Sequence, residues 1–318
     1  MIVVQHQSYM ESEINFRSGN NQLAGIVVVP ASTNPCPAII LVHGSGPADR
    51  DSNGAFIALR EYFASHGYAA LCYDKPGVGR STGDWTQQSF EDRAHEVVAA
   101  LRLLQAYPAI DTRYVGLCGA SQAGWIMPIV AQQANEIAFI ISISGPAVVT
   151  HEQEAYRIES QLRVDEFTEE QIEHALAIYS RRMEMIRQGA TAEQITSMQS
   201  EVNHEPWYEY LADNTPDDIR FFIANYEFDP VPFLKQVKCP FLGIWGELDT
   251  YVPVKKSVEL TRQALLEAGN NDVDLVVLPQ TNHRMRLTKT GSPKESGNEF
   301  TPRLWSTLTD WLVRTVGR

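Results

Sequence analysis

The segment Tyr114-Val-Gly-Leu-Cys-Gly-Ala-Ser-Gln-Ala-Gly124 decides the fold. It joins a short apolar run, typical of a buried strand, to a serine flanked by small residues, and an apolar stretch of helical spacing follows. A strand that turns sharply into a helix exposes a serine at the turn, and only small side chains fit beside it. Gly119 stands two residues before Ser121, and Ala123 two residues after it, where the usual Gly-x-Ser-x-Gly pattern has a second glycine. Because alanine adds only a methyl group, the segment still predicts a strand–turn–helix unit with Ser121 as a candidate nucleophile.

The rest of the chain extends this unit into a series of alternating strands and helices. A hairpin is predicted first, with strands at 11–17 and 22–29 around the turn residues 18–21. Short buried-strand runs then occur at 37–43, 68–73, 114–118, 138–144, 240–245 and 273–278, and helical patterns occur at 55–66, 90–107, 122–133, 254–268 and 304–316. This alternation predicts an α/β fold with a mostly parallel central sheet and helices on both faces.

The alternation stops between residues 150 and 236. This segment shows helical patterns and no convincing strand, with the clearest helix at 169–188 behind the capping signal Thr168-Glu-Glu-Gln171. Between residues 151 and 236 it carries 18 acidic and seven basic residues, a balance of −11 within a chain whose net charge is −13. We therefore expect residues 1–149 and 237–318 to form the α/β core, and residues 150–236 to form an inserted helical lid over the strand ends.

Composition and charge exclude several classes of protein. The chain has 318 residues, of which 44% are hydrophobic, and it has no apolar stretch long enough to span a bilayer. Its net negative charge disfavours binding to nucleic acid or to an anionic membrane. The N-terminus lacks a signal-peptide pattern, and the four cysteines lack metal-ligand spacing. We expect a soluble cytoplasmic protein with buried free thiols, no metal and no organic cofactor.

A serine nucleophile needs a base and an orienting acid, and both are predicted at the ends of later strands. Asp249 follows the apolar run that ends at Trp245, and His283 follows the strand predicted at 273–278. The order Ser, Asp, His is the one expected for this topology. His283 is the candidate general base, and Asp249 would hold its tautomer and stabilise the imidazolium. Glu247 is the alternative candidate for the acid, but we expect it to stabilise the loop or to face solvent.

The oxyanion hole is predicted from two backbone N–H groups. Gln122, directly after the candidate nucleophile, supplies one at a helix start. The second is assigned to Ser45 in the loop His43-Gly-Ser-Gly-Pro47, with Gly46 as the alternative donor. A phosphate-binding role for this glycine-rich loop is disfavoured, because it has neither the Gly-x-Gly-x-x-Gly spacing nor the Gly-Lys-Ser/Thr ending.

These residues resemble the α/β-hydrolase superfamily over nearly the whole chain. The loop His43-Gly-Ser-Gly-Pro-Ala-Asp-Arg-Asp51 resembles that of a bacterial carboxylesterase branch related to serine aminopeptidase-like and dienelactone-hydrolase-like hydrolases, in which it carries the oxyanion hole. Tyr73-Asp-Lys-Pro-Gly-Val-Gly-Arg-Ser81 is similar to the superfamily's Asp-x-x-Gly-x-Gly-x-Ser turn. We expect Asp74, Arg80 and Ser81 to be structural there, and Arg50 and Asp51 to pin the loop. The resemblance implies an α/β-hydrolase fold and ester hydrolysis through an acyl-enzyme.

The expected function is therefore that of a serine esterase acting on a small-molecule ester or lactone. An aromatic-rich end of the lid predicts substrate contacts from Trp207, Tyr208 and Phe222, beside Gly46 of the loop. An acidic lid suits a bulky uncharged or cationic substrate, such as a macrocyclic lactone, and disfavours a CoA thioester. Aminopeptidase, amidase and thioesterase activities on the same triad stay open. So does a non-catalytic ligand receptor on a hydrolase scaffold.

Overall fold

One sheet organises the molecule. The computed structural model describes residues 3–5, 9–32, 34–292, 294–295, 297 and 299–317. Within them, nine strands form a sheet in the order β1-β2-β3-β5-β4-β6-β7-β8-β9. The strands are β1 (Val3–Gln5), β2 (Tyr9–Ser18), β3 (Asn21–Pro30), β4 (Cys36–Val42), β5 (Ala69–Tyr73), β6 (Ile110–Ala120), β7 (Ile140–Ile143), β8 (Phe241–Gly246) and β9 (Val273–Leu278).

The direction of the strands places the loops that carry the candidate site residues at one edge of the sheet. β1, β2, β3 and β5 pair antiparallel, whereas β5, β4, β6, β7, β8 and β9 run parallel. The chain passes from β4 through β5 and then crosses back to β6 on the other side of β4, so the strand order switches between β4 and β6. Ligands in open α/β sheets bind at such a switch point, outside the carboxyl ends of the strands. The loops after β4, β6, β8 and β9 all leave the sheet at this edge.

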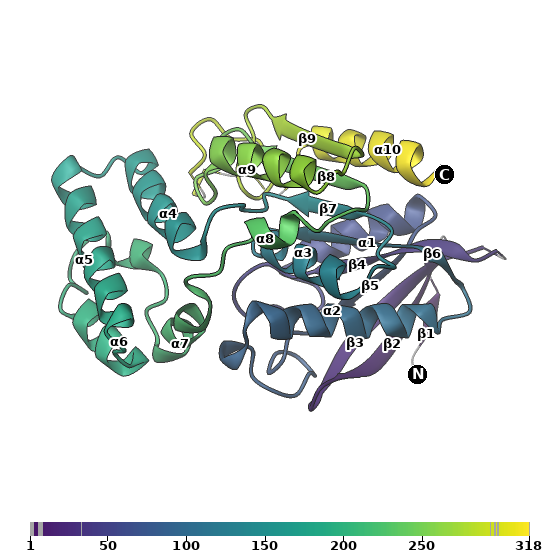
Figure 1. Ribbon diagram of the computed structural model, residues 1–318, viewed down its shortest axis with the longest axis horizontal. Helices are drawn as coiled ribbons and strands as arrows, with labels where there is room; N and C mark the ends of the chain where they lie inside the picture. The colour runs from purple at the N-terminus through teal and green to yellow at the C-terminus, as the bar shows by residue number, and fades with distance from the viewer. Residues whose placement is uncertain are drawn as a thin grey trace.

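Helices cover both faces of the sheet (Figure 1). One face carries α2 (Phe90–Gln105), α3 (Ala123–Gln133), α8 (Val231–Leu234) and α9 (Val254–Glu267), and the other carries α1 (Ala55–Ser65) and α10 (Pro302–Val316). The strand β4 is buried along its whole length, as a continuous apolar run between two helical layers requires. Each face therefore has its own apolar cluster.

The segment between β7 and β8 is helical. It contains α4 (Thr150–Val164), α5 (Glu169–Arg187), α6 (Ala192–Ser200), the short 3₁₀ helix η2 (Tyr208–Leu211) and α7 (Pro216–Asn225), which project from the strand ends at the left of Figure 1. These helices bury a third apolar cluster of their own. The short α8 packs in the core cluster instead, although its residues fall inside the segment predicted as a lid.

Most predicted elements are confirmed, with ends that differ by a few residues. Both capping-box bonds of α5 form, because the Thr168 hydroxyl accepts from the Gln171 amide and the Gln171 side chain accepts from the Thr168 amide. β1 was not predicted, and β6 begins at Ile110, earlier than the expected 114. No helix in the described ranges is both long enough and apolar enough to cross a membrane.

Candidate active site

Ser121 lies in a tight turn between β6 and α3. Its φ angle is +57°, a left-handed conformation that a non-glycine residue rarely adopts. The Ser121 amide donates to the Ile143 carbonyl at 2.9 Å, and the Gly124 amide donates to the Ser121 carbonyl at 2.8 Å. A Cβ added at Gly119 would lie 2.4 Å from the Cβ of Ala123. The turn therefore leaves no room for a side chain at position 119, the crowding that the small-residue pattern predicted.

Asp249 and His283 meet at the same edge of the sheet. Oδ2 of Asp249 lies 2.8 Å from Nδ1 of His283, and Oδ1 accepts from the amides of Tyr251 and Val252 at 2.8 and 2.9 Å. The Asp249 side chain is fully buried and that of His283 is 12% exposed. Glu247 instead accepts from the Gln280 amide at 3.0 Å. The carboxylate of Asp249 thus fixes the proton on Nδ1 of His283 and leaves Nε2 as the basic nitrogen.

Two further residues hold His283 in place, one at its ring and one at its backbone. The Tyr251 ring stacks on it with centroids 4.6 Å apart, and the Ser144 hydroxyl donates to the His283 carbonyl at 2.9 Å. The Tyr251 carbonyl in turn accepts from the Gln153 side chain of α4 at 2.6 Å. Sequence reasoning did not find Tyr251. Tyr251 stands two residues after the candidate acid, on the loop expected at the sheet edge, and this position could have indicated a role beside His283.

Two cavities meet at Ser121. The first, the insertion cavity, has a volume of about 420 Å³ and lies between the core and α4 and α7; its lining includes Ser45, Gly46, Ser121, Glu154, Asp213 and Phe222. The second, the loop cavity, has a volume of about 510 Å³; its lining includes Ser45, Phe56, Ser121, His283, Met285 and Leu304. Tyr251 lines both cavities. A substrate carbonyl at Ser121 would therefore have room for one substituent on each side.

The loop after β4 lies against Ser121. A Cβ added at Gly44 would come within 3.2 Å of the Ala120 carbonyl and 3.6 Å of the Ser121 Cβ. Within the described part of the chain, the amides of Ser45 and Gln122 donate to no protein oxygen. Both residues line the insertion cavity. Two unpaired amides beside a serine have the character of an oxyanion hole.

Two buried basic side chains support this loop. Lys75 donates to the carbonyls of Gly44 and Gly46 at 2.7 and 2.5 Å. Arg93 of α2 donates to the His43 carbonyl at 3.2 Å and to the Gln122 side chain at 2.8 Å. Arg93 stands on the apolar face of α2, so a charge at a core position of that helix was a signal that sequence reasoning did not use.

His43 is structural and neutral. Its ring stacks on Phe56 with centroids 4.6 Å apart, and its Nε2 lies 2.5 Å from the Tyr73 carbonyl. Burial, together with the nearby charge of Lys75, lowers the pKa of His43 to about 3. It therefore stays uncharged at neutral pH and supports the loop by packing.

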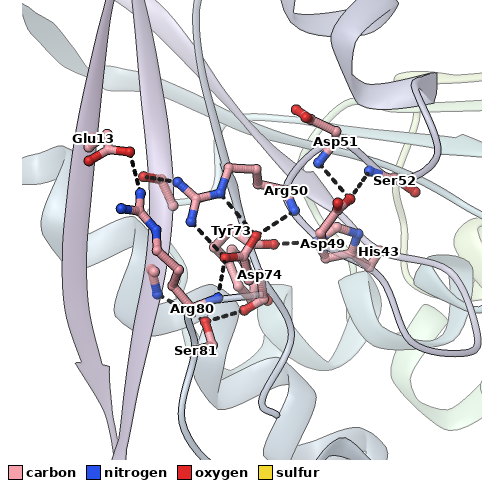
Figure 2. Close-up of polar contacts among 12 residues, drawn as sticks. Glu13, His43, Asp49, Arg50, Asp51, Ser52, Tyr73, Asp74, Arg80 and Ser81 are labelled. Carbon is pink, nitrogen blue, oxygen red and sulfur yellow. Dashed lines mark hydrogen bonds and ion pairs between the residues drawn. The ribbon is translucent and has the colours of Figure 1, made fainter. Parts of the chain in front are cut away.

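An ion-pair network fixes the far end of the same loop (Figure 2). Arg50 donates to both carboxylate oxygens of Asp74, at 3.0 and 2.6 Å, and the Arg80 amide donates to the same carboxylate at 2.9 Å. Burial favours the neutral form of Asp74, but these hydrogen bonds outweigh it and lower its pKa. The Ser81 hydroxyl donates to the Asp74 carbonyl, and Asp51 pairs with Arg60. The predicted pinning and structural roles of these residues are confirmed.

The expected substrate contacts divide into two groups. Gly46 and Phe222 line the insertion cavity. Trp207 is fully buried in the apolar cluster of the insertion, and Tyr208 packs against that cluster. This placement does not support a substrate contact for Trp207 or Tyr208, because neither lines the insertion cavity and the Trp207 ring packs against His174 of α5.

Two buried thiols are unreactive. Burial raises the pKa of the Cys72 and Cys118 thiols to about 12, which keeps both protonated. Among the positions that the structure describes, no three His, Cys, Asp or Glu side chains gather in a way that could hold a metal ion.

Comparison with known proteins places the chain in a family. A family model described as X-Pro dipeptidyl-peptidase (S15 family) matches residues 19–283. The chain belongs to this family. Among curated proteins, it is similar to Esterase EstD of Thermotoga maritima, with 22% identity over 89% of this chain and 61% of that protein. The match thus spans less than two thirds of the relative's length.

Solved structures relate this S15-family chain to the α/β-hydrolases. An esterase of Pyrococcus furiosus superposes with a TM-score of 0.65 at 17% identity, covering 96% of this chain and 91% of that one. An α/β-hydrolase from Penicillium sp. sh18 superposes with a TM-score of 0.61 at 15% identity, covering 97% and 99%. The predicted fold class is confirmed: the chain has the α/β-hydrolase fold.

Proposed function

We propose that the chain is a carboxylic ester hydrolase that works through an acyl-enzyme on Ser121. One observation carries the proposal: the Asp249–His283 hydrogen bond lies beside a cavity that Ser121 also lines. The strained turn at Ser121 supports it, because strain of this kind persists where function requires it. The similarity to proteins named esterases supports the reaction class.

The residues have distinct roles in the proposed reaction. The Ser121 oxygen attacks the ester carbonyl carbon while Nε2 of His283 takes the hydroxyl proton, giving a tetrahedral oxyanion. The amides of Ser45 and Gln122 donate to this oxyanion. Collapse breaks the bond to the alcohol, which leaves with the proton from His283. A water molecule then attacks the acyl-enzyme, giving one proton to His283, and the acid leaves as Ser121 regains its hydroxyl proton.

The substrate class follows from the cavities and their charge. The acyl and alcohol groups occupy the insertion cavity and the loop cavity, which together admit a bulky ester or lactone, including a macrocyclic lactone. Residues 150–236 act as a lid over residues 1–149 and 237–318. The acidic character of that segment supports a substrate that is uncharged or cationic. Cytoplasmic location stays a prediction from composition.

Amide hydrolysis is the second candidate. The description of the family, X-Pro dipeptidyl-peptidase, favours it, and the same triad serves aminopeptidases, amidases and thioesterases. The alcohol of an ester leaves more readily than the amine of an amide, so cleavage of activated esters accompanies either assignment. A receptor without catalysis would bind esters in the same cavities and leave them intact.

Turnover of p-nitrophenyl acetate and p-nitrophenyl butyrate tests the proposal. The unmutated protein should hydrolyse both and react with a fluorophosphonate at Ser121. Ser121→Ala should lose at least about 10³-fold in kcat, the scale expected for removal of a triad member. Ser306→Ala, which removes the hydroxyl of an exposed serine on α10, should change nothing. Absence of turnover and of labelling in the unmutated protein would favour the receptor, and faster cleavage of a proline-containing dipeptide anilide than of any ester would favour the peptidase.

A further inference from the structure

One wall of the insertion cavity is an uninterrupted polar face of α4. Thr150, Gln153, Glu154, Arg157 and Gln161 line the cavity at spacings of three or four residues, so they project from one side of the helix. Thr150, Glu154, Arg157 and Gln161 are at most 8% exposed. Burying polar side chains in this number is costly unless each finds a partner.

Two polar atoms on this wall lack a protein partner. Oγ1 of Thr150 and Nε2 of Gln161 are buried and make no hydrogen bond with any residue that the structure describes. The other side chains on this wall have partners. Arg157 donates to Glu154 at 2.6 and 2.9 Å and to the side-chain oxygen of Gln161 at 3.1 Å, and Gln153 donates to the Tyr251 carbonyl at 2.6 Å. A buried polar atom without a partner is unfavourable, and a polar group of a ligand would supply one.

The charge on the cavity lining is negative. Glu154, Glu209, Asp213 and Asp218 line it, against Arg157 as the one lining cation among the described residues. Glu154 is neutralised by Arg157, and Asp218 accepts a hydrogen bond from the Thr215 hydroxyl at 2.5 Å. The carboxylate of Asp213 accepts no hydrogen bond from the described residues.

Asp213 is also held in an unusual position. Ala212 and Asp213 have φ angles of +42° and +45°, so the chain brings this carboxylate to the cavity through two consecutive left-handed residues. Its nearest cation is Arg182 of α5, whose NH1 lies 3.8 Å from Oδ2, beyond hydrogen-bond distance. A ligand with an N–H⁺ group would donate to this carboxylate the hydrogen bond that it lacks.

Aromatic side chains form another part of the lining. Trp85, Trp125, Phe221 and Phe222 lie on the core and α7 sides of the cavity. Rings of this kind accept an apolar or flat body, and their faces attract a cation. Acidic and aromatic walls together favour an organic cation over a metal ion, which would need several oxygen ligands converging on one point.

We propose that the insertion cavity binds a protonated amine carried on an apolar or aromatic body. The ammonium group of this ligand pairs with Asp213, and other polar groups of the ligand hydrogen-bond to Thr150 and Gln161. The inference rests on the proposed function, because it assigns this amine to one side of the ester that Ser121 cleaves. It narrows the substrate from uncharged or cationic to cationic.

The affinity for the amine should rise with pH. Burial and the nearby charge of Glu154 raise the pKa of Asp213 to about 7, against the attraction of Arg182 and Arg157, and Asp218 adds to the rise. Only the ionised carboxylate binds an ammonium group strongly, so affinity should increase by about tenfold from pH 6 to pH 8.

Calorimetric titration of the full chain and of Ser121→Ala with benzylamine and benzyl alcohol tests the proposal. The two probes differ in the charged group, and neither needs turnover. Benzylammonium should bind about tenfold more tightly than benzyl alcohol in both proteins. Asp213→Asn should reduce this preference to about threefold or less, and asparagine tolerates the left-handed backbone. Glu173→Gln, which removes the same charge from an exposed position of α5, should keep the full preference.

The outcomes separate the two proposals. Equal binding of both probes, or a preference that survives in Asp213→Asn, would overturn the amine site whether or not esters are cleaved. Benzylammonium binding that depends on Asp213, in a protein that cleaves no ester, would uphold the site and reject the esterase. Benzyltrimethylammonium, which has charge but no N–H group, should bind more weakly than benzylammonium if the hydrogen bond to Asp213 contributes.

Discussion

At the scale of single residues, the support of the oxyanion loop depends on Lys75. This lysine is fully buried and donates to two carbonyls of the loop that carries Ser45. Burial, and the adjacent positive charge of Arg93, hold its pKa well below the ordinary value. A buried amine of this kind remains only where its hydrogen bonds fix the backbone. We regard Lys75 and Arg93 as positioning residues, because they contact the backbone and side chains that carry the two amides.

Replacing Lys75 by methionine should separate kcat from KM. The variant keeps the length of the side chain but loses both bonds, so the Ser45 amide is no longer held in the direction of the oxyanion. We expect kcat for p-nitrophenyl butyrate to fall by about 10- to 100-fold, with KM changed by less than about threefold, as for loss of an interaction made in the transition state. The exposed Lys255→Met serves as control. A parallel loss of kcat and of folded protein would assign Lys75 to stability alone.

The sequence predicted the residues that are marked by local pattern. Ser121, Asp249 and His283 each follow a strand closely, so their positions along the chain indicated a common edge. Tyr251 stands in the same loop as Asp249, and Lys75 stands in the loop after β5, but their partners are a ring and backbone carbonyls that are distant in sequence. No local pattern encodes such contacts.

At the scale of elements, the sequence predicts buried strands and capped helices, but it does not predict the short strand at the edge of the sheet. β4 and β8 are apolar along their whole length, and the capping box at Thr168 marks the start of α5. β1 has three residues and pairs only with β2, so its sequence holds too few positions for a pattern. The sequence places α4 in an acidic helical segment but does not indicate the role of its polar face, because that role depends on the cavity that the face lines.

The contact between β6 and α3 can be tested with a pair of substitutions. In Gly119→Ala, the new Cβ would lie 2.4 Å from the Ala123 Cβ and 2.7 Å from the Val42 carbonyl oxygen. We expect a loss of about 1–3 kcal/mol in the free energy of unfolding, measured by urea titration, and lower kcat from displacement of Ser121. Adding Ala123→Gly should restore only part of the stability, because the clash with Val42 remains. Full stability in the single variant would contradict the crowding.

At the scale of the whole molecule, polar contacts join the helical insertion to the core at several places. Asn225 of α7 accepts from the Phe90 amide at 2.9 Å and donates to the Gln88 carbonyl at 3.1 Å. A second junction joins Asp165, after α4, to the loop that follows His283. There the Asp165 carboxylate accepts from the Ser292 hydroxyl at 2.7 Å and pairs with Lys294 at 2.8 Å. Further contacts join α4 to the loop after β8, where the Gln153 and Tyr156 side chains donate to the carbonyls of Tyr251 and Asp249 at 2.6 and 3.1 Å.

Loosening the second junction should raise the mobility of the insertion without unfolding the core. Burial favours the neutral form of Asp165, but hydrogen bonds from Lys294, Tyr210 and Ser292 outweigh it and lower its pKa. The junction is therefore intact at neutral pH and is lost as pH falls through that lowered pKa. Asp165→Ala removes it at every pH. We expect faster amide hydrogen exchange in the segments around residues 165 and 292, with β4 and β6 as protected as before. Glu159→Ala, which removes an exposed ion pair within the insertion, should leave exchange at residue 292 unchanged. If exchange in Asp165→Ala matches the unmutated protein in both segments, the Asp165 junction does not restrain the insertion, and its other contacts with the core hold it.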